Sequence, residues 1–187
     1  MVKTASSMLP LGTQAPQFSL KNVVDGKMVN FNTNHHDIAT VIMFICNHCP
    51  YVKHISQQLY QLPRDYANQR IRFLAINAND TESYPDDSPE QMQRIAKEQN
   101  YLFPYLFDET QEVASAYHAT CTPDFFIFNK DNQLVYRGQL DDSRPGNHLP
   151  VDGHSIRLAL DCIIHNQPIP DEIQKPSLGC NIKWKNS

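Results

Sequence analysis

The sequence predicts a single α/β domain in which a central mixed β-sheet is flanked by helices. The unbroken apolar run 41–45 predicts a strand over 39–45 that is buried on both faces, and the segment 71–77 predicts a second buried strand. A segment with helical character follows each run, and this alternation is typical of parallel strands joined by crossover helices. The 187 residues are enough for one well-packed core, so we expect one domain over residues 1–187.

The chain is expected to begin with a β-hairpin over residues 12–31. Asp25-Gly26 lies there between two short apolar pieces, which is a hairpin signal because glycine tolerates turn conformations. The polar stretch 32–37 should be a loop that leads into the buried strand 39–45.

A helix is predicted after the first buried strand. Its apolar residues recur at spacings of three and four, which places them on one face: Val52, Ile55, Leu59 and Leu62. We expect Pro63 to kink or end this helix because proline cannot donate the backbone hydrogen bond.

The second half of the chain repeats the alternation. After the strand 71–77, the polar residues 78–87 should lie at the same sheet edge as the end of the first strand. A capping box at 88–91 predicts a helix over 89–100. The remaining expected elements are a strand at 105–107, a helix at 111–118, an antiparallel hairpin at 124–137, a helix at 156–164 and a proline-rich surface tail over 168–187.

Composition argues against several classes of partner. A net charge of −4 without any Lys/Arg run provides no footprint for nucleic acid or an anionic membrane. The first residues lack the apolar region of a secretory signal, and no apolar run approaches the ~20 residues of a membrane span. Five cysteines at irregular spacing do not form a secreted disulfide framework. These features predict a cytoplasmic protein without nucleic-acid or membrane partners.

The most informative motif is Cys46-Asn47-His48-Cys49-Pro50, where a buried strand gives way to a helix. A helix N-terminus carries partial positive charge and unpaired N–H groups, which stabilise a thiolate. Cys46 lies just ahead of the expected first turn, so its pKa should be lowered and it should be the nucleophile. An imidazolium at His48 would add to this effect, and Cys49 should be the more buried partner.

Two other interpretations of the cysteine pair stay open. A CxxC can be half of a zinc site, with His48, His54 or the pair His35 and His36 as further ligands. No second closely spaced ligand pair is present, so we expect no metal. Cysteines can also be plain apolar core residues. The neighbouring His48 and the strand-to-helix boundary argue against that interpretation.

The order of elements, the CxxC that opens the first long helix and Thr122-Pro123 before the closing hairpin resemble the thioredoxin superfamily over nearly the whole chain. The resemblance implies a thioredoxin fold in which Pro123 is cis and faces the CxxC. It also implies that the backbone of Thr122 pairs with the substrate chain. Thr122 and Pro123 are therefore the candidate substrate-binding residues.

Within that superfamily, residues 12–20 resemble the opening of the alkyl hydroperoxide reductase and thiol-specific antioxidant branch, the peroxiredoxins. Segments 46–53 and 179–184 resemble its peroxiredoxin-like group. Peroxiredoxins carry Pro-x-x-x-Thr-x-x-Cys, and with Cys49 as the last residue the Thr position holds another cysteine and the Pro position holds Ile42. The groups that polarise a peroxide are therefore not in place, which argues against a dedicated peroxidase.

The motif also departs from thioredoxins proper. These carry a Trp before the first cysteine and a buried Asp six residues ahead of it, where this chain has Ile45 and Thr40. Asn47-His48 is closer to the Cys-x-His-Cys of protein disulfide isomerases and periplasmic oxidants, whose potentials are higher. We predict a moderately oxidising couple with a potential above about −270 mV.

Two further cysteines are candidate accessory thiols. Cys121, two residues before Pro123, is expected near the CxxC, where it either takes part in exchange or only packs. Cys180 is a candidate resolving thiol that reaches back to the site, or else a tail residue packed by Ile182 and Trp184.

Together these residues predict a thiol-disulfide oxidoreductase. Cys46 attacks a substrate disulfide, and Cys49 then displaces the reduced substrate, with His48 setting the redox poise. The expected substrates are protein or small-molecule disulfides and thiols, and no cofactor is needed. The alternatives are a peroxiredoxin-like thiol peroxidase that acts on hydroperoxides and is resolved by the CxxC partner or Cys180, and a non-enzymatic adaptor that senses redox state or metal.

Overall fold

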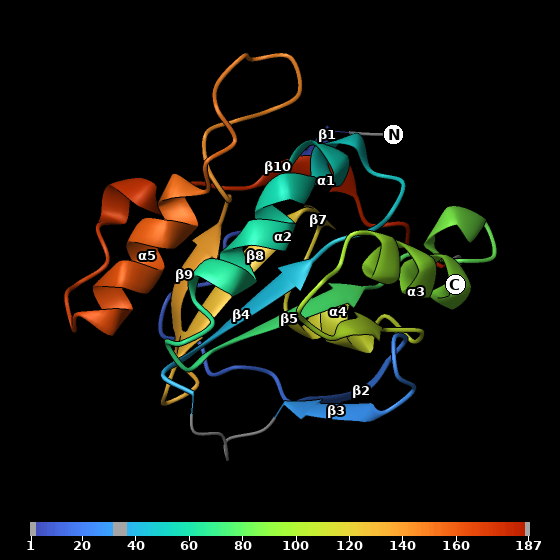
Figure 1. Ribbon diagram of the computed structural model, residues 1–187, viewed down its shortest axis with the longest axis horizontal. Helices are drawn as coiled ribbons and strands as arrows, with labels where there is room; N and C mark the ends of the chain where they lie inside the picture. Colours follow the sequence, from blue (N-terminus) through green and yellow to red (C-terminus); the bar gives the residue numbers. More distant parts are fainter. Residues whose placement is uncertain (1–2, 32–36, 186–187) are drawn as a thin grey trace.

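A computed structural model describes residues 3–31 and 37–185. In this part of the chain the main sheet has seven strands, in the order β3-β2-β6-β5-β4-β8-β9 (Figure 1). In that order the strands are Met28–Phe31, Phe18–Asn22, Tyr105–Phe107, Ile71–Asn77, Ala39–Phe44, Asp124–Asn129 and Leu134–Gly138. The predicted loop at 32–37 falls outside the described residues except for Asp37, and His35 and His36 fall outside them as well.

Strand directions agree with the predicted mixed sheet. β4 runs parallel to β5, and β5 runs parallel to β6. Two antiparallel hairpins close the sheet at its edges, β2 with β3 and β8 with β9, as the sequence predicts. The carboxyl end of β4 and the segment that follows β5 therefore meet at one edge of the sheet.

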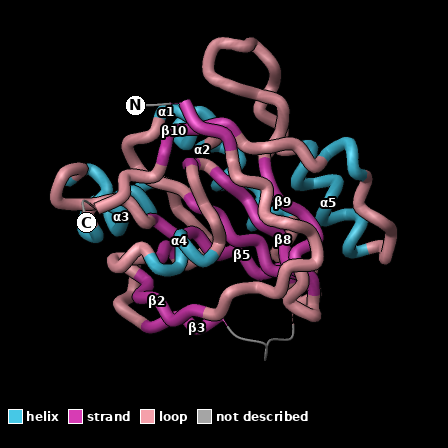
Figure 2. Tube along the Cα trace, turned by 180° about the vertical axis from the view of Figure 1, so that it is seen from behind, coloured by secondary structure: helices cyan, strands magenta, loops and turns pink. Residues whose placement is uncertain are grey.

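Helices cover both faces of the sheet. One face carries α1 (Pro50–His54), α2 (Ser56–Asp65), α3 (Pro89–Glu98) and α5 (His154–Ile164), and the other carries α4 (Glu112–Ala116) with the N-terminal segment (Figures 1 and 2).

Alternate residues of β4 enter the two cores. Val41 and Met43 pack under α1 and α2, whereas Ile42 and Phe44 pack on the α4 side. Because each such side chain contributes roughly 1.5–3 kcal/mol when fully buried, the strand that leads to the CxxC is held from both sides.

Pro63 does not itself end the helix, which continues for two more residues to Asp65. Pro63 lies inside α2, and the helix is interrupted one turn after the CxxC, at Ile55. The N–H of Ile55 donates to Val52 O at 3.2 Å, three residues back, which tightens and ends α1. Proline removes one backbone hydrogen bond, and here α2 tolerates this loss two residues before its own end.

The C-terminal segment is more than the surface tail that was expected. Its strand β10 (Leu178–Asn181) lies between β1 (Lys3–Ala5) and β7 (Cys121–Thr122) in a second, three-stranded sheet. Cys180 is the pairing partner of Thr122 in this sheet. Figures 1 and 2 show β1 and β10 beside α1, at the end of the molecule where β4 finishes.

The close pairing of β10 with β7 requires glycine at position 179. A Cβ added to Gly179 would lie 2.0 Å from the backbone oxygen of Thr122. No side chain fits at such a distance, so Gly179 allows the two backbones to approach.

No helix among the described residues combines the length and the apolar character needed to cross a bilayer.

Candidate active site

The CxxC lies at the end of β4, as predicted. The N–H of Ile45 still bonds to Ile76 O at 3.0 Å, and the chain then turns through Cys46 toward α1. Because α1 begins at Pro50, Cys49 is the N-cap residue of this helix. Cys46 and Cys49 are both buried, at 1% and 0% exposure.

Thr122 contacts both sulfurs. Its side-chain oxygen lies 3.2 Å from Cys46 Sγ, and its carbonyl oxygen lies 3.2 Å from Cys49 Sγ. The peptide bond between Thr122 and Pro123 is cis. The predicted juxtaposition of Thr122-Pro123 with the CxxC is therefore present.

A third sulfur completes the cluster. Cys180 Sγ, carried by β10, lies 2.8 Å from Cys49 Sγ, and the Cys180 side chain is buried. All three cysteines are free thiols in this structure. Cys49 is thus flanked by Cys46 on one side and by Cys180 on the other.

The pKa shifts favour the thiolate at Cys49, whereas the sequence analysis expected it at Cys46. The S–H of Cys46 donates to Cys49 and lowers the Cys49 pKa to about 5 against the opposing effect of burial, and the Cys180 thiol and the Val52 N–H add to the lowering. The pKa of Cys46 is raised, first by this same hydrogen bond, then by burial and by the carboxylate of Asp87. The hydrogen bond between the two thiols is the largest cause of this difference, and the Val52 N–H is the contribution from the first turn of α1.

The two thiols behave as one acid. The hydrogen bond between Cys46 and Cys49 couples their titrations, so the low pKa belongs to the pair, and transfer of the proton that they share moves the charge from one sulfur to the other. Cys46 therefore becomes a thiolate whenever Cys49 takes up the shared proton.

A buried carboxylate, Asp87, organises the loop between the two cysteines. Asp87 Oδ1 accepts the backbone N–H groups of Asn47 and His48, at 2.7 and 3.3 Å. Asp87 Oδ2 lies 2.5 Å from His48 Nδ1 and accepts from Asn79 Nδ2 at 2.7 Å. Burial alone would raise the pKa of Asp87, but these hydrogen bonds outweigh burial and lower it. His48 is thereby held against a carboxylate, with its ring stacked on Tyr84 at 5.4 Å between centroids.

Sequence reasoning did not identify Asp87. It placed segment 78–87 at the edge of the sheet that carries the CxxC, which is correct. No spacing rule could select this carboxylate among the neighbouring acidic residues.

A metal ligand set can be defined among the described residues. Donor atoms of Cys46, His48 and Asp87 lie within 4.8 Å of one another. This group does not include Cys49, so it differs from the CxxC-centred zinc site considered above. His54 does not take part, because its Nε2 lies 2.8 Å from Ser143 Oγ.

Cys121 is a buried neighbour of the cluster. Its sulfur lies 3.9 Å from Pro123 O, and burial raises the pKa of this thiol, with further increments from the charges of Asp124 and Cys49. Cys121 is therefore a poor nucleophile in this state.

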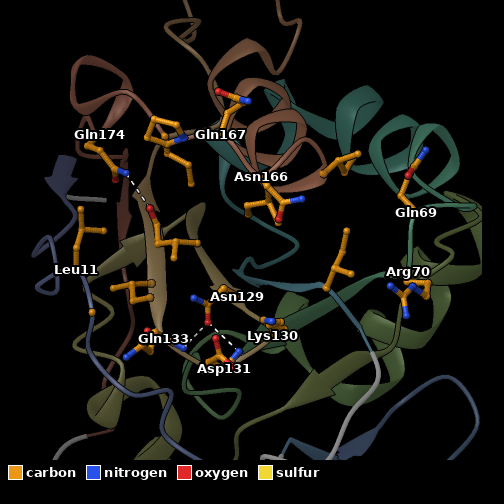
Figure 3. A pocket seen from close by; sticks show the side chains of 18 of the residues that line it. Leu11, Gln69, Arg70, Asn129, Lys130, Asp131, Gln133, Asn166, Gln167 and Gln174 are labelled. Atoms are coloured by element: carbon orange, nitrogen blue, oxygen red, sulfur yellow. Dashed lines mark hydrogen bonds between the residues drawn. The ribbon is translucent and has the colours of Figure 1, made fainter.

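Two cavities have different relations to the thiols. One, of about 860 Å³, lies where β4 begins and has amide side chains such as Gln69, Asn129 and Asn166 around it (Figure 3). No cysteine lines it, so we do not take it as the reaction site although it is the larger. The other, of about 260 Å³, includes Cys46 in its wall.

The thiolate can be measured directly. We expect the ultraviolet thiolate absorbance of the reduced protein to titrate with a midpoint of about 5. This transition should be absent in a Cys49→Ser protein and unchanged in Cys162→Ser, a half-buried cysteine of α5. The pKa of Cys49 in the folded protein lies below the value of about 8.5 for an unfolded thiol. The thiolate therefore stabilises the fold fully at pH values above about 8.5, and this stabilisation is lost as the pH falls from about 8.5 to the folded-state pKa of about 5. A midpoint near 8.5 would contradict the assignment.

Comparison with known proteins gives a consistent family. Residues 11–137 match the model of the AhpC/TSA family. No curated protein matches the chain. The chain is similar to an uncharacterized conserved protein from Geobacillus kaustophilus whose crystal structure is known. The two sequences are 58% identical, the TM-score is 0.97, and the match covers 100% of this chain and 98% of that chain.

Two other solved structures extend the comparison. A hypothetical protein from Sinorhizobium meliloti is 40% identical with a TM-score of 0.95, covering 98% of this chain and 100% of that one. The thioredoxin domain of a thiol-disulfide oxidoreductase from Bacteroides vulgatus is 14% identical with a TM-score of 0.60, covering 72% of this chain and 91% of that one, which shows a shared fold. With its thioredoxin fold and its match to the family model, the chain belongs to the AhpC/TSA family, in the peroxiredoxin-like group of the thioredoxin superfamily.

Proposed function

We propose that the protein is a thiol-disulfide oxidoreductase in which Cys46 and Cys49 cycle between dithiol and disulfide. The observation that carries this proposal is the contact of Thr122 with both sulfurs, beside Pro123. A dithiol in contact with a polar backbone edge can hold the two sulfurs of an exchanging disulfide in line. We propose the reducing cytoplasm as the compartment for this chemistry, because five cysteines at irregular spacing do not form a framework of structural disulfides.

The reaction begins with the shared proton. Cys49 takes this proton, and the thiolate of Cys46 attacks one sulfur of the substrate, whose other sulfur leaves as a thiolate. Cys49 then loses its proton to the leaving thiolate and attacks Cys46 Sγ, which releases the second half of the substrate as a thiol after protonation from solvent. The dithiol is oxidised and one substrate disulfide is reduced to two thiols.

Four residues around the pair have supporting roles in the proposal. Thr122, beside Pro123, contacts and orients the two sulfurs, while β10 occupies the backbone edge that the resemblance assigns to a substrate. His48, held by Asp87, sets the redox poise by placing an ionisable ring beside the pair. We keep the prediction of a potential above about −270 mV, which equilibration with glutathione buffers would measure.

Mass spectrometry of trapped intermediates tests this function. In a reduced Cys49→Ser protein mixed with a disulfide substrate, we expect a stable mixed disulfide on Cys46, because the resolving sulfur is missing. Cys46→Ser should give no such adduct at position 46 and should lose turnover by at least about a hundredfold. Absence of any adduct on Cys46, combined with rapid sulfenic acid formation in hydrogen peroxide, would reject the oxidoreductase assignment.

A thiol peroxidase is the second candidate, and a specific observation favours it. Cys49 directly precedes Pro50 at the start of α1, and its pKa is lowered to about 5. A thiolate is the form of cysteine that attacks a peroxide O–O bond. Cys49 would become a sulfenic acid as the peroxide is reduced to an alcohol or water, and Cys46 or Cys180 would then form a disulfide with it and release water. Rapid consumption of hydroperoxide that depends on Cys49 would support this candidate.

A non-enzymatic adaptor is the remaining alternative. Its metal-sensing form would use the ligand set of Cys46, His48 and Asp87. Elemental analysis of the purified protein, together with Asp87→Asn, distinguishes this alternative from the two enzymes, because only the adaptor requires stoichiometric metal that is lost in the variant.

A further inference from the structure

Strand β10 closes the side of the cluster on which an extended substrate would have to lie. Its residue Cys180 pairs with Thr122, and Gly179 leaves no space above the Thr122 carbonyl. The sulfur of Cys180 therefore occupies the position beside Cys49 that the sulfur of an incoming substrate would need. A peptide cannot pair with Thr122 while β10 is in place.

A cavity on the opposite side gives access to Cys46. It is bounded by the loop after β4, by α1 and the start of α2, and by α3 and the segment that leads to β6. Its volume of about 260 Å³ is slightly below the usual range of small-molecule sites and far too small for a folded partner. Lys53 and Gln99 lie at its solvent-exposed rim, so a small molecule can enter without displacing β10.

The walls of the cavity specify the chemistry of a ligand. Ile45, Val52 and Ile95 make an apolar surface, and Tyr101 and Tyr105 add aromatic rings. Burial raises the pKa of Tyr101 to about 12, so its hydroxyl is a neutral donor.

Lys53 is the cation among the residues that line the cavity. The reacting thiolate of Cys46 is the anion in its wall, and no carboxylate of the described residues lines it. The ammonium group of Lys53 favours an anionic group on the ligand, and the apolar walls favour an organic body.

We propose that the dithiol reacts with small anionic organic disulfides that enter through this cavity and not with extended peptide disulfides. The inference rests on the proposed oxidoreductase function and names its substrate class. The carboxylate of the disulfide lies toward Lys53, and its sulfur meets Cys46. The two electrons come from Cys46 and Cys49, which end as a disulfide, and the substrate leaves as two thiols.

Single-turnover kinetics with the fully reduced protein tests this inference. The probes are dithiobis(nitrobenzoate), which is anionic, dithiodipyridine, which is neutral, and a linear peptide with an intermolecular disulfide to cysteine. Each rate is divided by the rate of the same probe with free N-acetylcysteine, because the probes differ in leaving-group pKa. We expect the resulting relative rates at Cys46 to be on the order of a hundredfold higher for both small probes than for the peptide, because the peptide must wait for local opening of β10. Peptide mapping of the first adduct in Cys49→Ser identifies the reacting sulfur.

Two pairs of variants test the cavity itself. Ser56→Trp places a large ring in the cavity and should slow both small probes about tenfold, whereas Gln57→Trp, exposed on the same helix, should not. Lys53→Gln should lower the ratio of the anionic to the neutral rate about fivefold, and Lys97→Gln on α3 should leave this ratio unchanged. The ratio cancels any change in the nucleophilicity of Cys46.

The outcomes separate the inference from the function on which it rests. If no disulfide of any kind reacts at Cys46, the proposed function fails. If the peptide reacts as fast as the small probes and Ser56→Trp has no effect, the cavity is not the entrance, and the oxidoreductase function stands. An unchanged rate ratio in Lys53→Gln overturns the preference for an anion.

Discussion

Gly179→Ala is expected to separate β10 from β7 and to open the redox site. The added methyl group would lie 2.0 Å from the Thr122 oxygen, so the two backbones must move apart. We expect a loss of about 3 kcal/mol in the free energy of unfolding, or roughly 9 °C in melting temperature. The Cys49 titration should also shift upward, because the N–H and thiol of Cys180 help to lower this pKa.

Calorimetry and limited proteolysis measure this effect. Gly146→Ala is the control, because nothing lies within 4 Å of its added methyl group, and its positive φ of 87° gives the cost of backbone strain without a close approach. The control should cost only about 1 kcal/mol. Proteolytic cleavage within residues 176–185 should be faster in Gly179→Ala but not in Gly146→Ala. The reaction of Gly179→Ala with the peptide disulfide should be faster as well. Equal melting temperatures for the two variants would show that β10 does not depend on this close approach.

Oxidation of a Cys46→Ser protein with diamide is expected to join Cys49 to Cys180. Their sulfurs are already 2.8 Å apart, and the other partner of Cys49 is absent in this variant. The new bond would close a loop of more than a hundred residues, for which chain-entropy arguments give about 4.7 kcal/mol of stabilisation. The melting temperature should rise by roughly 10 °C on oxidation.

The double variant Cys46→Ser/Cys180→Ser is the control for this cross-link. It should show no intramolecular disulfide in peptide maps and no rise in melting temperature. If the single variant also stays reduced, or forms only intermolecular disulfides, Cys180 is not a resolving thiol. Unchanged cycling of a Cys180→Ser protein with intact Cys46 would lead to the same conclusion.

The central architecture follows from local sequence signals. Strands β4 and β5 begin and end within one residue of the predicted strands. Short segments made mostly of apolar residues are typical of strands that are buried on both faces of a sheet. The helix α3 begins where its capping residue Ser88 predicts, with Gln91 N–H donating to Ser88 Oγ at 3.4 Å. Pattern and packing agree at these elements, so the sequence alone was sufficient.

The second sheet could not be predicted in this way. β1 and β10 have three and four residues, too few for a period to show, and their pairing joins segments far apart in the chain. The resemblance assigned the edge at Thr122 to a substrate, whereas the chain's own Cys180 occupies it. A short strand at a site is specified by its partners and not by its own composition.

The distribution of charge in the site does not follow from the helix boundary alone. Pro50 fits the first helical position, and this already implies that Cys49 is the N-cap. The lowered pKa was expected at Cys46, whereas the hydrogen bond between the two thiols and the N–H of Val52 favour Cys49. Asp87 and the cavity beside Cys46 arise from long-range packing, for which the sequence contains no local pattern.

The order of synthesis has a consequence for the redox site. Cys49 precedes Cys180 by 131 residues, so β10 is made long after the CxxC. Thr122 itself follows Cys49 by 73 residues, so 58 residues separate it from Cys180. At about 5–20 residues per second, the nascent chain spends roughly 3–12 s with the edge at Thr122 uncovered. During that interval the protein resembles an open thioredoxin and can exchange with other nascent chains or folding factors. The selectivity of the mature site is therefore acquired only when the C-terminal strand leaves the ribosome and docks.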